Sequence, residues 1–180
     1  MKINRMIIGG YVLKKSILEE LPIRMCIQER NNLWIPINEI EKNYNQYFNI
    51  VEFCRSLLLS MINHLILTYG QDLKNEQWIL EPFADMIISF SIIDIGFKRF
   101  YGLDENGHKK NTEKVFKLSL ANHFYKILSN SELILEYVPN DDMNKKIQKN
   151  LKELKYEPNR IKYKQDIVED LYKYKKYYLD

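Results

Sequence analysis

The sequence is poor in the residues that usually build compact reactive sites. Its 180 residues include only two cysteines, three histidines, five prolines and six glycines. Cys26 and Cys54 lie far apart and form no CxxC pair, which argues against a disulfide framework and against a zinc finger. The first residues show no apolar stretch before a small-residue cleavage site. We therefore expect a cytoplasmic protein with free, inert thiols.

A strong net charge is also lacking. The formal charge is +3, which points to no particular class of partner, and 46% of the residues are hydrophobic. These values exclude a disordered chain and favour a globular protein with a real core. The most apolar stretch, residues 78–97, contains Glu81, Pro82, Asp85 and Asp94. We interpret it as a buried helix and not as a membrane-spanning segment.

Motifs that would carry chemistry are missing as well. His64, His108 and His123 are scattered, with no HExxH or Glu-x-x-His pair near them, so no metal site is predicted. We interpret His64 as a hydrogen-bonded core residue. Gly9 and Gly10 lack the preceding strand and further glycines of a nucleotide-binding loop, and they predict close packing of two helices instead. The sequence also shows no recognisable pair of a catalytic nucleophile and its general base.

Helical periodicity dominates the chain and predicts an all-α, antiparallel helical bundle. We expect Pro22 to end the first helix, the segment NNLWIPIN to form a loop that buries Trp34 and Ile35, and Gly70 to follow the second long helix in a left-handed conformation. The helices are expected at residues 3–20, 23–30, 43–69, 73–101 and 113–128, then from a cap at Asp141 to a stop at Pro158, and at 164–174.

Several details of these helices are predicted. Pro82 should kink the third long helix or mark its first turn, and Gly96 should allow a close helix contact. Asn111 or Thr112 should cap the next helix. The inward-facing residues should be Tyr47, Val51, Cys54, Leu58, Met61 and Leu65 in the second long helix, Ile88 in the third, Leu118, Ala121, Tyr125 and Leu128 in the fourth, Met143, Ile147, Leu151 and Leu154 after Asp141, and Ile167, Val168 and Leu171 in the last.

Asp85 and Asp94 are the charged residues inside the most apolar helix. Nine residues apart, they lie on opposite faces of the helix and cannot act on one substrate. Asp94 has Lys98 four residues on, which predicts an ordinary supporting ion pair. A buried carboxylate such as Asp85 needs a partner, and we favour an arginine or a helix terminus over a functional role.

The end of the chain is more polar than the rest. We expect one helical-bundle domain over residues 1–180, with residues 140–180 as a basic helical extension. Two interpretations of its lysines and tyrosines stay open: a solvated helix face, which we favour, or a surface for nucleic acid or an anionic membrane. Its cations are Lys145, Lys146, Lys149, Lys152, Lys155, Arg160, Lys162, Lys164, Lys173, Lys175 and Lys176.

Three segments resemble the acyl-CoA dehydrogenases. INRMIIGGYVLKK, at residues 3–15, is similar to the segment that follows the catalytic glutamate motif, written E-G-T-N-E-I-N-R-M. KNEQWILEPFADMIISF, at 74–90, looks like a helix of the long, very-long-chain type, although Pro82 stands where an asparagine is usual. NLKELKYEPNRIKYKQDI, at 150–167, is similar to the closing segment of those long forms. Their order and spacing agree over almost the whole chain.

The resemblance implies a flavoprotein relative from fatty acid β-oxidation, without the residues that do its chemistry. The family's glutamate stands a few residues before the equivalent of Ile3-Asn4-Arg5, so no catalytic, FAD-binding or metal-binding residue is carried over. The implied function is a non-catalytic C-terminal helical module, inactive alone, that associates as a homodimer or with a dehydrogenase core chain. Alternatives are a complementing part of a split enzyme, with FAD supplied only by the other chain, and a membrane- or nucleic-acid-binding helical protein.

Overall fold

The computed structural model describes residues 2–23, 25–26, 45–102, 108–153 and 156–174. Within these ranges every regular element is a helix, as the sequence predicts. The predicted segment 23–30 and the loop with Trp34 and Ile35 lie largely outside the described residues. The elements are α1 (Lys2–Ile17), α3 (Asn45–Tyr69), the 3-10 helix η2 (Gly70–Asn75), α4 (Gln77–Tyr101), α5 (His108–Tyr137), α6 (Asp142–Glu153) and α7 (Arg160–Tyr174).

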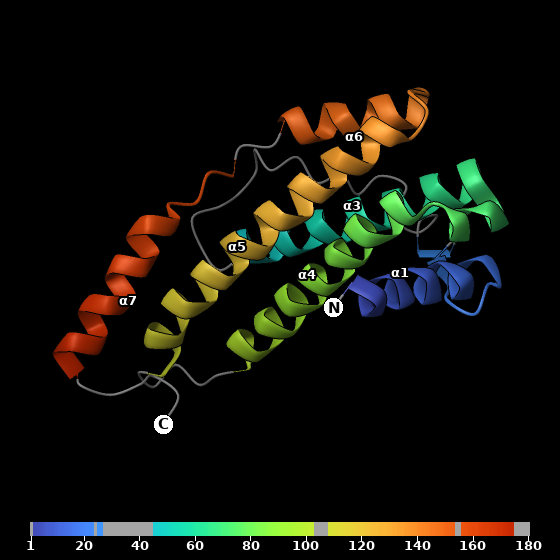
Figure 1. Cartoon of the computed structure of the whole chain (residues 1–180). Helices are drawn as coiled ribbons and strands as arrows, with labels where there is room; N and C mark the ends of the chain where they lie inside the picture. The colour runs from blue at the N-terminus through green and yellow to red at the C-terminus, as the bar shows by residue number, and fades with distance from the viewer. Residues whose placement is uncertain (1, 24, 27–44, 103–107, 154–155, 175–180) are drawn as a thin grey trace.

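Helix α4 is the centre of the bundle. It runs antiparallel to α5, and it also packs against α1 and α3 (Figure 1). Helix α6 turns back over the end of α5, and α7 lies along the first half of α5. The central position predicted for the most apolar helix is therefore confirmed, and it follows from the narrow polar face of that helix.

The core is built on α3, whose predicted inward stripe is buried throughout. At one end of the bundle, the Phe100 and Phe116 rings stack with centroids 5.0 Å apart, and Tyr47 meets Phe116 edge-on at 5.5 Å. Such aromatic pairs add to the free energy of folding beyond the apolar area that they bury. Ile88, predicted as core, is only half-buried.

Two helix boundaries on the first half of the chain differ from the prediction. α1 ends at Ile17, ahead of Pro22, because Glu19 takes a left-handed conformation with φ 58° and the chain turns there. The helix expected from residue 73 begins at Gln77, because Gly70, with φ 52°, ends α3 and residues 70–75 form a separate 3-10 turn. Pro82 therefore lies beyond the first turn of α4.

Helix α5 is much longer than predicted, and its inward face is different. Both proposed caps lie inside it, and the polar run after Leu128 does not end it, because the turn that follows buries Ile134 and Leu135 in the core. Asn130 Nδ2 and Ser131 Oγ donate to carbonyl oxygens of the preceding turn at 2.8 and 2.7 Å, which gives both side chains a partner within the helix. Leu118, Tyr125 and Leu128 are half-buried. The described α5 residues that are buried, besides the predicted Ala121, are Phe116, Leu120, Phe124, Ile127, Ser131, Ile134 and Leu135.

The caps of the last two helices depend on short polar side chains. Asp141 Oδ1 accepts a hydrogen bond from the backbone N–H of Asn144 at 2.8 Å, which confirms the predicted cap of α6. Helix α7 begins at Arg160, four residues before the predicted start, because Asn159 Oδ1 accepts from the N–H of Lys162 at 2.9 Å. Ile147 is buried, whereas Val168 is exposed.

One helical segment among the described residues is long and apolar enough to cross a membrane. It is Tyr47–Asn75; residues 78–97, which we interpreted as a buried helix and not as a membrane-spanning segment, do not form such a segment. In the bundle, 61% of its apolar window is buried, as expected of a core helix.

Candidate functional site

A close backbone contact joins α1 and α4. A Cβ atom on Gly9 would lie 2.8 Å from the backbone oxygen of Leu80, and 3.5 Å from the Ala84 side chain. Gly9 therefore lets two backbones approach, as predicted. Gly10 has no such role, because a Cβ atom there would meet no atom within 4 Å.

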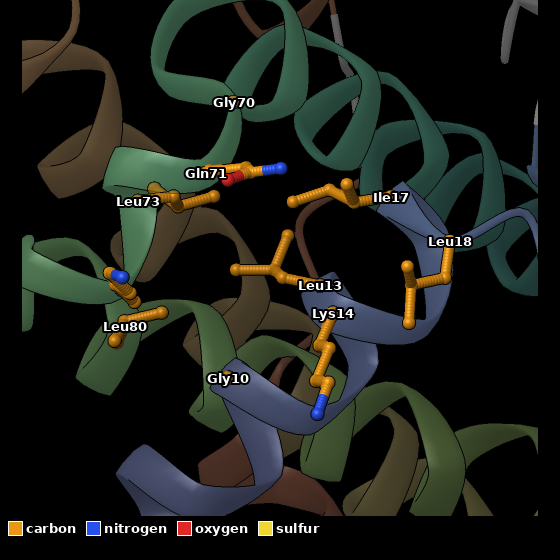
Figure 2. A pocket seen from close by; sticks show the side chains of 10 residues that line it. Gly10, Leu13, Lys14, Ile17, Leu18, Gly70, Gln71, Leu73 and Leu80 are labelled. Atoms are coloured by element: carbon orange, nitrogen blue, oxygen red, sulfur yellow. The ribbon is translucent and has the colours of Figure 1, made fainter.

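A cavity opens beside this contact, bounded by α1, η2 and the start of α4. Its volume is about 400 Å³. In Figure 2, Leu13 and Ile17 reach from α1 toward Leu73 and Leu80, and the Gln71 side chain extends across the space from η2. The cavity is lined by Gly10, Leu13, Lys14, Ile17, Leu18, Gly70, Gln71, Leu73, Lys74 and Leu80. This lining is aliphatic, with two lysines and one amide.

Two of the predicted candidates meet at the turn between α5 and α6. His64 is buried on α3, with Nδ1 3.7 Å from Asp141 Oδ2, and its Nε2 has no hydrogen-bond partner among the described residues. Burial lowers the pKa of His64 more than the charge of Asp141 raises it, so the imidazole is neutral near pH 7. The predicted core position of His64 is confirmed, but the predicted hydrogen bonding is not found within the described residues. Its Asp141 neighbour already serves as the cap of α6.

The Asn144 amide closes the same turn. It is fully buried, and its Nδ2 donates to the carbonyl oxygens of Leu135 and Pro139 at 3.0 and 3.1 Å. The Leu135 carbonyl belongs to the last turn of α5, where the helix supplies no backbone partner, whereas the Pro139 oxygen also accepts from the N–H of Asp141 at 2.9 Å. The group of polar residues around His64 is thus engaged in helix capping.

The carboxylates of α4 are engaged in ion pairs or hydrogen bonds. Arg55 of α3 contacts Asp94 at 2.8 Å, and Lys98 contacts the other Asp94 oxygen at 2.6 Å, as predicted. Asp85 is half-buried and also has an interaction partner. That this partner is an arginine or a helix terminus stays a prediction.

A second polar network, not predicted, joins α3 to α5. Tyr47 donates to Glu113 Oε1 at 2.9 Å, and Lys117 lies 2.8 Å from the same oxygen. Burial raises the pKa of Glu113, but the hydrogen bonds from Lys117 and Tyr47 and the charge of Lys117 outweigh this effect and lower the pKa. The result is a structural carboxylate held ionised.

The thiols and the basic extension show no reactive arrangement. Cys26 and Cys54 are free, and burial raises the pKa of the Cys54 thiol, which keeps it protonated. In the part of the chain that the structure describes, no group of three or more His, Cys, Asp or Glu could hold a metal ion. The lysines of α6, Lys145, Lys146, Lys149 and Lys152, are exposed.

Two contacts, an ion pair and a cation–ring contact, join α7 to α5. Lys114 of α5 forms an ion pair with Asp170, and the Arg160 guanidinium lies 4.5 Å from the centroid of the Tyr125 ring. Arg160 and Tyr125 also border a shallow hollow of about 430 Å³ beside His123. Part of the basic composition of the extension therefore serves packing.

Comparison with known proteins places this fold. No protein-family model and no curated protein sequence matches the chain. Among solved structures, it is similar to an acyl-CoA dehydrogenase from Bacillus anthracis, crystallised with FAD, with a TM-score of 0.75 and 24% sequence identity. The match covers 96% of this chain and 30% of that chain, so the chain spans less than a third of that enzyme.

At this identity the likeness establishes the fold, while activity has to be argued from the site. The all-α architecture is confirmed, and the predicted resemblance to the acyl-CoA dehydrogenases is confirmed at the level of the fold. The chain has the fold of the all-α C-terminal domain of an acyl-CoA dehydrogenase.

Proposed function

We propose that this chain is a C-terminal helical region of the acyl-CoA dehydrogenase type that acts by association and not by chemistry of its own. Its partner is a second copy of the chain or a separate chain that carries a dehydrogenase core. The proposal is supported by the fold and, above all, by one surface: the side of α1 that faces away from the bundle. The described polar clusters, by contrast, are engaged in caps and ion pairs.

Helix α1 has apolar residues on both sides. Gly9, Leu13 and Ser16 are buried on the side that faces the bundle. The opposite side, which we call the outer face of α1, is formed by Ile7 and Tyr11, which are 62% and 60% exposed. Exposed apolar groups that adjoin one another on a helix are typical of an interaction surface.

The charges of α1 favour an acidic partner surface. Lys15 is paired with Glu20, which follows the helix, whereas Lys14 forms no ion pair with a described acidic residue, and α1 itself contains no acidic residue. An apolar surface beside a positive charge fits an apolar patch rimmed by carboxylates, because complementary charge orients two surfaces as they meet. The same partner could cover exposed Ile95, on the part of α4 that follows its contact with α1.

Sedimentation tests this proposal. The purified chain, alone and mixed with an acyl-CoA dehydrogenase core that lacks this region, should sediment as a dimer or as a complex with the core. Tyr11→Glu places a charge on the outer face and should abolish the association. Tyr172→Glu, at an 81% exposed position of α7, is the matched control and should change nothing. A chain that stays monomeric in both samples contradicts the proposal.

The cofactor is part of the same proposal. We expect the chain alone to carry no flavin absorbance and to oxidise no acyl-CoA. Bound flavin, or oxidation by the chain on its own, would exclude a purely associative role.

A second candidate function is completion of a split dehydrogenase in trans. It is favoured by the coverage, because this chain matches 30% of a dehydrogenase crystallised with FAD. It predicts a neighbouring coding sequence that ends near an E-G-T-N motif, and it predicts that this product gains acyl-CoA oxidation when the chain is added. Sequencing the DNA upstream decides the first point, and the absence of such a coding sequence removes the support.

The basic extension favours a third candidate, binding to an anionic membrane or to nucleic acid. The exposed lysine side chains of α6 suggest this candidate function. Binding through phosphates would weaken steeply as salt is raised. If the chain ignores anionic vesicles and nucleic acid at low salt, these lysines form only a solvated helix face.

A further inference from the structure

The cavity between α1, η2 and α4 has the composition of a ligand site that none of the roles above uses. We propose that it binds a free straight-chain carboxylate, with the alkyl chain among the leucines and the carboxylate at the lysines of its edge. The inference rests on three properties of the cavity: its volume, its aliphatic lining and the charges at its mouth. It does not depend on the proposed association of the chain.

The volume and the lining suit an alkyl chain. About 400 Å³ falls in the range of ligand pockets, roughly 300–1,000 Å³, and is well above the ~150 Å³ cavity that holds benzene. The inner walls are Leu13, Ile17, Leu73 and Leu80, and none of the lining residues is aromatic. A flexible chain of methylene groups can follow such a surface, whereas a flat ring would have no ring to stack on.

The charges at the mouth favour an anion. Lys14 and Lys74 line the cavity, and no carboxylate does. Figure 2 shows the Lys14 ammonium directed away from the cluster of leucines, which puts it at the edge of the space. Neither lysine forms an ion pair with a described acidic residue. In Figure 2 the Gln71 amide lies on the other side of the leucines from the Lys14 ammonium, so the cavity offers a carboxylate separate donors at its edge.

Chain length provides the first test. Hexanoate, octanoate and decanoate are titrated into the full chain by calorimetry, below the concentrations at which they form micelles. Each buried methylene group should tighten binding about fourfold, corresponding to ~0.8 kcal/mol, until the cavity is full. Absence of binding by all three acids, or affinity that does not change with chain length, overturns the proposal.

Filling the cavity provides the second test. Gly10 lines the cavity and has open space around its Cβ position, so Gly10→Leu should occupy the cavity without disturbing the fold. Decanoate binding should fall at least tenfold in this variant. Tyr11→Leu, one residue along on the outer face of α1, is the matched control and should bind as the native chain does. Unchanged binding by Gly10→Leu, with native circular dichroism, contradicts the assigned site.

The charge of the head group is tested separately. Decanol should bind more weakly than decanoate, and Lys14→Gln and Lys74→Gln should each weaken decanoate binding about two- to fivefold, the range for exposed charge pairs. Lys162→Gln on α7 is the control. Equal binding of decanol and decanoate overturns the anion part of the proposal. Because Gly10→Leu should leave the sedimenting mass unchanged and Tyr11→Glu should leave decanoate binding unchanged, failure of one proposal is distinguishable from failure of the other.

Discussion

The backbone oxygen of Leu80 lies 2.8 Å from the position that a Cβ atom on Gly9 would take, while the same position on Gly10 is open. Two adjacent glycines of one helix therefore differ completely in what they contact. Gly9 sets the distance between α1 and α4, and Gly10 borders the cavity.

This difference predicts opposite effects of the same substitution. Gly9→Ala should destabilise the chain by about 1–3 kcal/mol, because α1 has to move away from α4. Gly10→Ala should stabilise it by about 0.5–1 kcal/mol, because alanine favours a helix and meets no obstacle. Urea denaturation of the two variants gives both values. Equal effects of the two substitutions would disprove the close contact.

The cap of α6 predicts a second difference between neighbours. Asp141→Ala removes the acceptor for the N–H of Asn144 and should cost about 0.5–2 kcal/mol. Asp142→Ala changes a fully exposed side chain and should cost much less. Thermal unfolding of both variants measures the difference. A larger loss from Asp142→Ala would show that Asp141 is not the cap.

Core burial predicts the outcome of two large-to-small substitutions. Leu58→Ala should cost about 2–5 kcal/mol, because the side chain lies in the core. Ile88→Ala should cost clearly less, because Ile88 is half-buried. Denaturant midpoints decide the order, and a reversed order would contradict the orientation of α4.

Buried histidine predicts how stability depends on pH. Burial lowers the pKa values of His64 and His123, so around pH 6 the unfolded chain binds more protons than the folded chain. Above the pKa of histidine in the unfolded chain, about 6.5, the imidazoles are neutral in both states and the stability is complete. As the pH falls below this pKa, the unfolded chain takes up protons first and the free energy of unfolding decreases. Unfolding free energies measured between pH 8 and pH 5 should show this decline, and His64→Gln should make it shallower. Stability that rises over this range on acidification would contradict the buried, neutral His64.

Features set by local side chains were largely accessible from the sequence. The stripe of α3 follows from apolar spacing, Asp141 as a cap follows from its place before a periodic segment, and the left-handed Gly70 follows from its missing Cβ. The sequence also predicted that Gly9 would lie in a helix contact. Each of these follows from the residues of a single segment, although that segment does not identify Leu80 as the partner of Gly9.

Features set by contacts between distant segments were not accessible. The predicted helix ended at residue 128, before the polar residues 129–131, yet Asn130 and Ser131 bond to the preceding turn and α5 continues to Tyr137. The cavity draws its walls from α1, η2 and α4, which no periodicity in one segment connects. The only sequence signal for it was Gly10, a glycine beside the packing glycine Gly9 without a packing role of its own.

The central claim is that the outer face of α1 is a contact surface, and covalent footprinting of Tyr11 tests it most directly. Tyr11 is labelled with an oxidising reagent in dilute chain, in concentrated chain and in chain mixed with a dehydrogenase core, with exposed Tyr172 as the internal reference. We predict that Tyr11 becomes protected in the concentrated or the mixed sample while labelling of Tyr172 stays constant. Equal labelling of Tyr11 in all three samples would contradict the account.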